Sequence, residues 1–127
     1  MQKLGLNELE GEGGYFRRVY ESPAMIGDRF AATAIYFMLT PKQPISHLHR
    51  LKSDEIWHFY AGSPITIVEI FEGKVTKTVL GNDLQEVLLD RMVFSHTVKA
   101  GAWFGSYLNS KTDFSIVGCT VVPGFDF

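Results

Sequence analysis

Two histidines separated by one residue and followed by a glutamate are the most chemically suggestive pattern in the sequence. His47 and His49 lie in the stretch SHLHRLKSDEIWHFYAG, and five residues separate His49 from Glu55. If residues 46–50 form a strand, the two imidazoles point to one face, because side chains alternate along a strand. Two imidazoles and one carboxylate are the ligands of a facial triad, which suits Fe(II), Mn(II), Ni(II) or Zn(II). The pattern therefore indicates a metal site formed by His47, His49 and Glu55.

The same residues also suit chemistry that needs no metal. A carboxylate beside an imidazole orients the ring and raises its basicity, so Glu55 next to His49 would make a general base. A short motif of this kind also occurs by chance, in which case the histidines are surface or packing residues. The residues alone leave these three interpretations open.

Aromatic side chains near this stretch and near the C-terminal third could line a cavity for a small molecule. The candidate ligand-binding residues are Trp57, Phe59, Trp103, Phe104 and Tyr107. Trp103 and Phe104 are adjacent and cannot both point inward on a regular strand, so we expect at least one of them to serve packing.

The elements expected to position these residues are short strands. Runs of aromatic and β-branched residues, separated by turns rich in Gly, Pro, Asn and Asp, predict an all-β sandwich, barrel or jelly roll. A short helical turn is expected at Lys3–Leu9, and a break near Asp90 divides the segment 87–98. The predicted strands cover residues 15–20, 30–40, 46–50, 54–60, 65–71, 74–80, 87–98, 102–108 and 113–122.

Composition and charge limit the expected partners and cellular location of the protein. The 127 residues carry a net charge of −2 and no block of basic residues, which gives no electrostatic basis for nucleic-acid binding. Cys119 is the one cysteine, so no intrachain disulfide forms, and with no signal-peptide pattern this predicts a reducing, cytoplasmic location. The longest apolar run, 30–39, is too short to span a bilayer, so no membrane association is expected.

Larger segments resemble a known family. The pattern His-x-His, five residues, Glu, six residues, Gly is similar to the first conserved motif of the cupin superfamily, which usually has three or four residues before the Glu. The segments EGGYFRRVYES, TAIYFML, HRLKSDEIWHFYAG, AGAWFGS and GCTVVPGFDF resemble, in this order, one subfamily of small cupins classed as a domain of unknown function. The resemblance implies a double-stranded β-helix, a jelly-roll barrel, as a single domain over residues 1–127 that pairs as a homodimer.

The sequence departs from the superfamily pattern in places that bear on a metal. Pro41 stands where the first motif has a Gly, and Lys99-Ala100-Gly101 replaces a Pro-x-Gly turn. Phe104 occupies the position at which the second motif supplies a fourth ligand, a His, while His96 lies upstream at a position that does not match the motif. Three candidate ligands of four remain, and three suffice for many catalytic metal sites.

The resemblance implies three functions, between which a fold does not decide. In each the barrel binds a small molecule. The first is a metal-independent isomerase or epimerase that uses His49 and Glu55. The second is a metal-dependent oxygenase or lyase with His47, His49 and Glu55 as ligands of a divalent metal. The third is a protein that binds a small ligand without catalysis.

Overall fold

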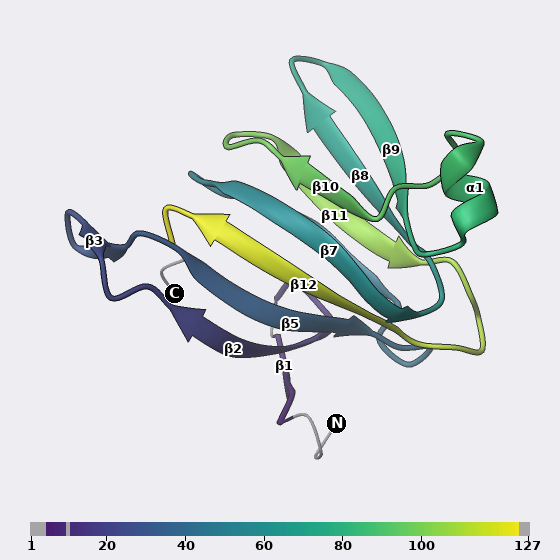
Figure 1. Ribbon diagram of the computed structural model, residues 1–127, viewed down its shortest axis with the longest axis horizontal. Helices are drawn as coiled ribbons and strands as arrows, with labels where there is room; N and C mark the ends of the chain where they lie inside the picture. Colours follow the sequence, from purple (N-terminus) through teal and green to yellow (C-terminus); the bar gives the residue numbers. More distant parts are fainter. Residues whose placement is uncertain (1–4, 10, 125–127) are drawn as a thin grey trace.

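The computed structural model describes residues 5–9 and 11–124, and there the chain forms two facing antiparallel β-sheets (Figure 1). The six-stranded sheet has the order β1 (Asn7–Glu8), β2 (Tyr15–Glu21), β5 (Thr33–Leu39), β12 (Ser115–Val122), β7 (Asp54–Gly62) and β10 (Ser95–Val98). The four-stranded sheet has the order β6 (Ile45–Arg50), β11 (Trp103–Leu108), β8 (Ile65–Phe71) and β9 (Lys74–Leu80). A small hairpin of β3 (Met25–Ile26) and β4 (Arg29–Phe30) extends from one end.

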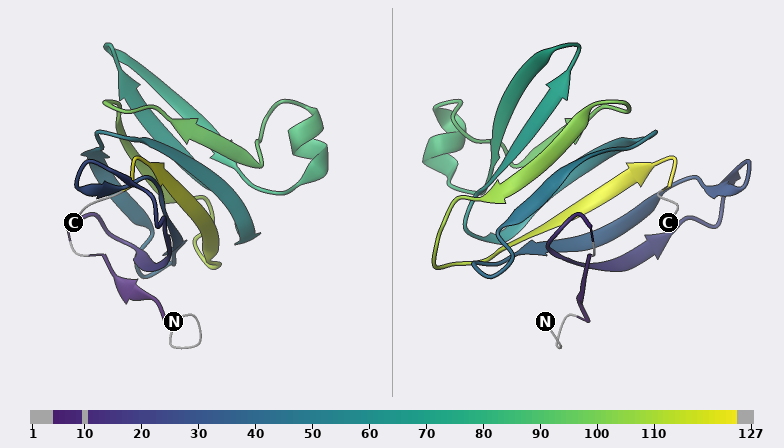
Figure 2. Two further views of the ribbon diagram at one scale, coloured as in Figure 1. Left: turned by 60° about the vertical axis from the view of Figure 1, so that its left-hand side comes forward. Right: turned by 180° about the vertical axis from the view of Figure 1, so that it is seen from behind.

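The predicted all-β jelly roll is confirmed, and strand alternation explains it. On β12, Val117, Cys119 and Val121 are buried between the sheets, while the residues between them are more exposed except Gly118. The facing strand β8 contributes Ile65 and Ile67, both at most 1% exposed. The apolar core therefore fills the space between the two layers. Figure 2 shows the ribbons of the two layers from two further sides.

Three sequence predictions about elements are wrong in part. The predicted strand 30–40 is interrupted at residues 31–32, between β4 and β5. Part of the predicted strand 87–98 is helix α1 (Leu84–Leu88), because the Asp83 side chain caps its N-terminus by accepting from the amides of Gln85 and Glu86. Residues 3–4 of the predicted helical turn lie outside the described residues, and Asn7–Glu8 form β1 instead. In the part of the chain that the structure describes, no helix has the length and apolar character needed to cross a membrane.

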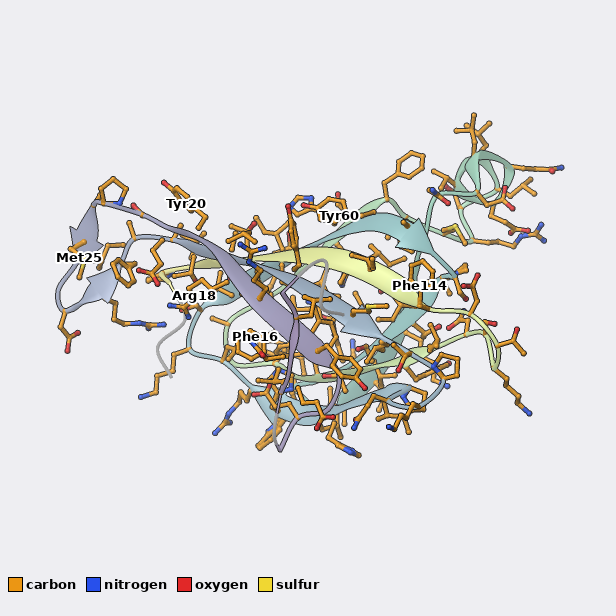
Figure 3. The ribbon with its side chains drawn as sticks, turned by 90° about the horizontal axis from the view of Figure 1, so that it is seen from below. Phe16, Arg18, Tyr20, Met25, Tyr60 and Phe114 are labelled. Carbon is orange, nitrogen blue, oxygen red and sulfur yellow. The ribbon has the colours of Figure 1, made fainter. Side chains whose placement is uncertain are left out.

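The outer surface of the six-stranded sheet carries exposed aromatic residues. Tyr20 and Tyr60 are about half exposed and project away from the barrel, whereas Phe16 points into it (Figure 3). The Tyr60 ring packs edge-on against Tyr36, with ring centroids 6.2 Å apart, and lies over Gly118, where no side chain blocks it. The sheet thus presents an aromatic outer face rather than a fully polar one.

A β-bulge interrupts β6 at the histidines. His49 pairs with Phe104, and Ser46 pairs with Ser106. Counting these paired residues, β6 has four residues over the segment in which β11 has three. As a result Ser46 is buried, His47 and Leu48 are both exposed, and His49 turns inward again. Gly105 makes the bulge possible, because a Cβ at this position would lie 2.7 Å from the Ser46 carbonyl oxygen.

We predict that Gly105→Ala destabilises the fold by about 1–3 kcal/mol, the usual cost of overpacking a closely packed site. The added methyl group would contact the backbone of the bulge, which cannot move aside as a flexible side chain does. Urea unfolding would measure the loss. Ser106→Ala is the matched control on the same strand, because the buried Ser106 hydroxyl makes no hydrogen bond within the described residues. Equal stability of the Gly105 variant and the wild type would contradict this view of the bulge.

Candidate functional site

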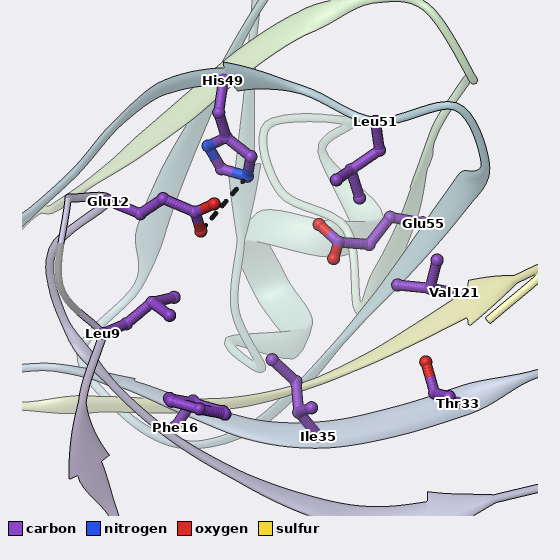
Figure 4. Close-up of a pocket in the computed structure, with 9 residues that line it drawn as sticks. All are labelled: Leu9, Glu12, Phe16, Thr33, Ile35, His49, Leu51, Glu55 and Val121. Carbon is purple, nitrogen blue, oxygen red and sulfur yellow. Dashed lines mark ion pairs between the residues drawn. The ribbon is translucent and has the colours of Figure 1, made fainter. Parts of the chain in front are cut away.

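A cavity opens between the sheets, and its inner lobe borders the apolar core (Figure 4). It has an outer and an inner lobe that share five residues, namely Leu9, Glu12, Ile35, His49 and Glu55. The outer lobe has a volume of about 40 Å³ and the inner lobe a volume of about 30 Å³. Space on this scale holds a ligand of only a few non-hydrogen atoms.

Strand register places the lining residues. The inward-facing pairs between β12 and β7 are, in order, Val121 with Glu55, Cys119 with Trp57, and Val117 with Phe59. The first pair lines the outer lobe, the second lines the inner lobe, and the third belongs to the apolar core. One continuous ladder therefore passes from packed core to cavity wall.

Glu55 is a carboxyl group in an apolar wall. It is 7% exposed, and burial raises the pKa of its carboxyl from 4.5 to about 8. The Trp57 indole N–H lies near enough to lower this pKa part of the way, and the charge of Glu12 raises it further. At neutral pH Glu55 is therefore mostly the protonated acid, able to donate a proton.

The orientation of His49 is fixed by its own strand. Its Nδ1 lies 2.9 Å from the carbonyl oxygen of His47, and because a carbonyl only accepts, Nδ1 must carry the hydrogen. The neutral ring then has its lone pair on Nε2, which points into the cavity (Figure 4). The ring also packs on Phe104, with centroids 4.2 Å apart. His49 is thus held as a base in one tautomer.

Glu12 is the carboxylate that faces this imidazole. Its Oε2 lies 3.7 Å from His49 Nε2. The backbone of Glu12 is also hydrogen-bonded to the bulge, because the His47 amide donates to the Glu12 carbonyl oxygen over 2.6 Å. Gly13 has φ +92°, and a Cβ there would collide with the Ile45 carbonyl oxygen at 2.2 Å. Glu12 and Gly13 therefore lie against β6 at the wall of the cavity.

Sequence reasoning missed Glu12. It expected Glu55 beside His49, whereas the structure sets Glu12 there and Glu55 on another part of the wall (Figure 4). The only signal was an acid between two glycines, Gly11 and Gly13, which indicates a tight turn but not the strand that the turn meets.

The predicted convergence of His47 with His49 and Glu55 is wrong. The bulge leaves the His47 side chain exposed beside Gly13, outside both lobes of the cavity that His49 and Glu55 line. Among the described residues no group of three His, Cys, Asp or Glu side chains is arranged to hold a metal ion. The donors therefore do not fit the metal site that the resemblance implied, and no chemical step is derived through a metal. His47 contributes its backbone instead.

The five predicted ligand-binding aromatic residues separate into three groups. Trp57, 2% exposed, lines the inner lobe. Phe59 and Phe104 pack in or against the apolar core. Trp103 and Tyr107 lie on the outside, where the guanidinium of Arg50 covers the Trp103 ring at 5.0 Å and the ammonium of Lys77 lies 6.0 Å from the Tyr107 ring. Their predicted role in the cavity does not agree with these positions.

Three further residues, His96, Lys99 and Cys119, lie at the following places in the structure. His96 Nε2 contacts the carboxylate of Glu69 across the two sheets, and neither residue lines the cavity described above. Lys99 is exposed in the turn before β11. Cys119 lines the inner lobe, and burial, together with the charge of Glu55, raises the pKa of its thiol well above the usual value, so it remains a neutral thiol.

A family model described as Cupin superfamily (DUF985) matches residues 1–127. Among proteins of known sequence, an uncharacterized protein of Saccharomyces cerevisiae, YML079W, is 27% identical over 91% of this chain. The chain spans 65% of the length of that yeast relative.

Solved structures give closer matches. Protein SO0799 from Shewanella oneidensis is 40% identical with a TM-score of 0.89, covering 99% of this chain and 77% of that one. A hypothetical protein from Leishmania major is 32% identical with a TM-score of 0.85, covering 98% and 80%. Oxalate decarboxylase of Bacillus subtilis, a protein with Mn(II) centres, has a TM-score of 0.67 at 14% identity over 97% of this chain and 29% of its own, which shows a shared fold alone.

We predict that Glu55 makes stability fall as the pH rises. In the folded chain it keeps its proton up to about pH 8, whereas in the unfolded chain it ionises near 4.5, so each pH unit between them costs about 1.4 kcal/mol of folding free energy. Glu55→Gln removes this pH dependence of stability. The stability of the variant should therefore increase relative to that of the wild type from about pH 5 to about pH 8. Urea unfolding across that range would measure the difference.

Glu86→Gln is the matched control, since Glu86 is an exposed carboxylate paired with Arg91. Its stability should follow the wild type over the same interval. Parallel curves for the Glu55 variant and the wild type would contradict a protonated buried carboxyl.

Proposed function

The chain belongs to the cupin superfamily, in the family DUF985, and we propose that it is a metal-independent isomerase or epimerase acting on a small molecule in the cavity. The observation that carries the proposal is the orientation of His49. Its Nδ1 is held by the His47 carbonyl, so that a basic Nε2 projects into an apolar space. A base that is fixed before the ligand arrives needs no rearrangement during proton transfer.

Glu55 supports the proposal as the acid. It occupies the same cavity as His49, and its pKa of about 8 keeps a proton available near neutral pH. A protonated acid and an imidazole with a free lone pair in one cavity are the two groups that proton transfer in an isomerisation requires. The titratable groups that share this wall are Glu12, His49 and Cys119.

The proposed step balances within the site. His49 Nε2 removes a proton from a carbon next to a carbonyl, and the C–H electron pair becomes the new C=C bond. Glu55 gives its proton to the carbonyl oxygen, which takes up the displaced π electrons, so an enol forms. When the first carbon carries a hydroxyl group, this intermediate is an enediol. In the second step the Glu55 carboxylate takes the proton of that other hydroxyl, whose oxygen becomes the new carbonyl, and the imidazolium delivers its proton to the former carbonyl carbon, so that the isomer forms and both groups are restored.

Glu12 completes the proposed site as a positioning residue. Its carboxylate lies 3.7 Å from His49 Nε2, where a positive charge develops when the ring takes a proton. A fixed carboxylate at this distance stabilises the imidazolium. The proposed roles therefore differ from those expected from the sequence. Glu12, rather than Glu55, assists the base His49, and Glu55 is the acid.

The two other functions lead to different observations. A metal-dependent oxygenase or lyase would require ligands from outside the described residues, because His47 faces away from His49 and Glu55. A protein that only binds a small ligand would use the same cavity without exchanging protons. The cytoplasmic location stays a prediction.

We predict that the protein exchanges carbon-bound hydrogen with solvent, and that His49→Gln lowers this rate by at least about 100-fold, as loss of a general base does. The protein would be incubated in D2O with a panel of sugars and small carbonyl compounds, and NMR would follow deuterium at carbon. EDTA should have no effect.

His58→Gln is the control, because His58 lies on β7 beside Trp57 but on the opposite face of the strand, and it does not line the cavity. A rate that survives His49→Gln, or that EDTA abolishes, would rule out the proposed mechanism. A panel in which no compound exchanges would favour binding without catalysis.

We also propose that two copies pair through the outer face of the six-stranded sheet. This face carries Tyr20 and Tyr60, 50% and 51% exposed, and exposed aromatic groups on one sheet favour association. Light scattering at micromolar concentration should give a dimer mass, and Tyr60→Glu should shift it toward monomer. Val75→Glu is the control, since Val75 is 62% exposed on the other sheet. A monomeric wild type would refute the proposal.

A further inference from the structure

The cavity is lined without any compensating positive charge. Among the described residues that line its two lobes, none is Lys or Arg, while two, Glu12 and Glu55, carry carboxyl groups. Arg18 also lies on the inner side of the sheet (Figure 3), but it forms an ion pair with Glu21 at 3.6 Å and does not line either lobe. An anion that enters would lose hydration and gain no countercharge from these walls.

Glu12 makes the mouth of the cavity repulsive to anions. Its carboxylate side chain is 29% exposed and faces the lone pair of His49. A carboxylate or phosphate placed within reach of His49 Nε2 would therefore lie a few ångströms from a like charge in a poorly hydrated space, where repulsion is strong. The backbone carbonyl of Glu12 accepts a hydrogen bond from the His47 amide, which holds this residue beside the cavity.

The inner lobe offers a hydrogen-bond donor in place of a charge. Trp57 is 2% exposed, and its indole Nε1 is buried without a hydrogen-bond partner in the described residues. An acceptor on a ligand would satisfy this buried donor. Glu55, on the same wall, interacts with this indole and also faces the ligand space. The remaining wall is largely apolar.

We propose that the cavity selects uncharged carbonyl compounds with a small apolar body, anchored by the Trp57 indole N–H, and that Glu12 excludes carboxylates and phosphates. This inference rests on the proposed function only where such a compound is called a substrate. The selectivity of binding does not depend on catalysis. It narrows the class of molecule that the proton-transfer site accepts.

Isobutyramide and isobutyrate are suitable probes, since they share a carbon skeleton and differ in charge. Each would be titrated into 15N-labelled protein at neutral pH while the two indole N–H resonances are followed. Trp57 lines the cavity and Trp103 lies outside it, so Trp103 is an internal control. We expect isobutyramide to shift the Trp57 signal alone, and isobutyrate to need at least about tenfold higher concentration.

Glu12→Gln should bring the affinities of the two probes together, because it removes the like charge and keeps the shape of the loop. Equal or tighter binding of isobutyrate by the wild type would overturn the inference. So would an unchanged ratio in the variant, or no response of Trp57 to isobutyramide. Selective binding without hydrogen exchange in the earlier assay would refute the proposed function and leave this inference intact.

Discussion

The one-residue bulge in β6 is the constraint on which the site depends. By adding a residue opposite Gly105, it withdraws the backbone of His47 from regular pairing with β11. The freed carbonyl orients His49, and the freed amide holds the loop of Glu12. The path of this one short backbone segment therefore sets the positions of the His49 imidazole, of the Glu12 carboxylate and of the loop that carries Glu12.

The protonated state of Glu55 follows from a second constraint, the register of the central strands. The ladder between β12 and β7 places Glu55 one step beyond the apolar core, beside Val121, where water is scarce but a ligand can enter. A carboxyl group there is costly to ionise, so the folded chain loses stability between about pH 5 and about pH 8 while it keeps this carboxyl protonated in the cavity. The same apolar core that stabilises the barrel thus sets the chemistry of its wall.

The sequence predicted the barrel well because alternation and turn residues are local signals. It placed Glu55 and Trp57 on one inward face correctly, since β7 is regular over those residues. It failed at His47 because a spacing of two residues defines one face only on a strand without a bulge, and Gly105, which admits the bulge, lies far away in the chain. Glu12 could not be paired with His49, because a turn rich in glycine does not specify the strand that it meets.

The position of β12 has a consequence for how the barrel assembles. It is translated after every other described strand, yet it lies between β5 and β7 at the centre of the six-stranded sheet (Figure 1). Until it is in place, both neighbours have unpaired backbone edges facing each other, which are the surfaces through which nascent chains associate wrongly. The six-stranded sheet is therefore completed by the filling of a central gap rather than by addition at an edge, and Val121 and Cys119 join the cavity wall only when β12 fills that gap.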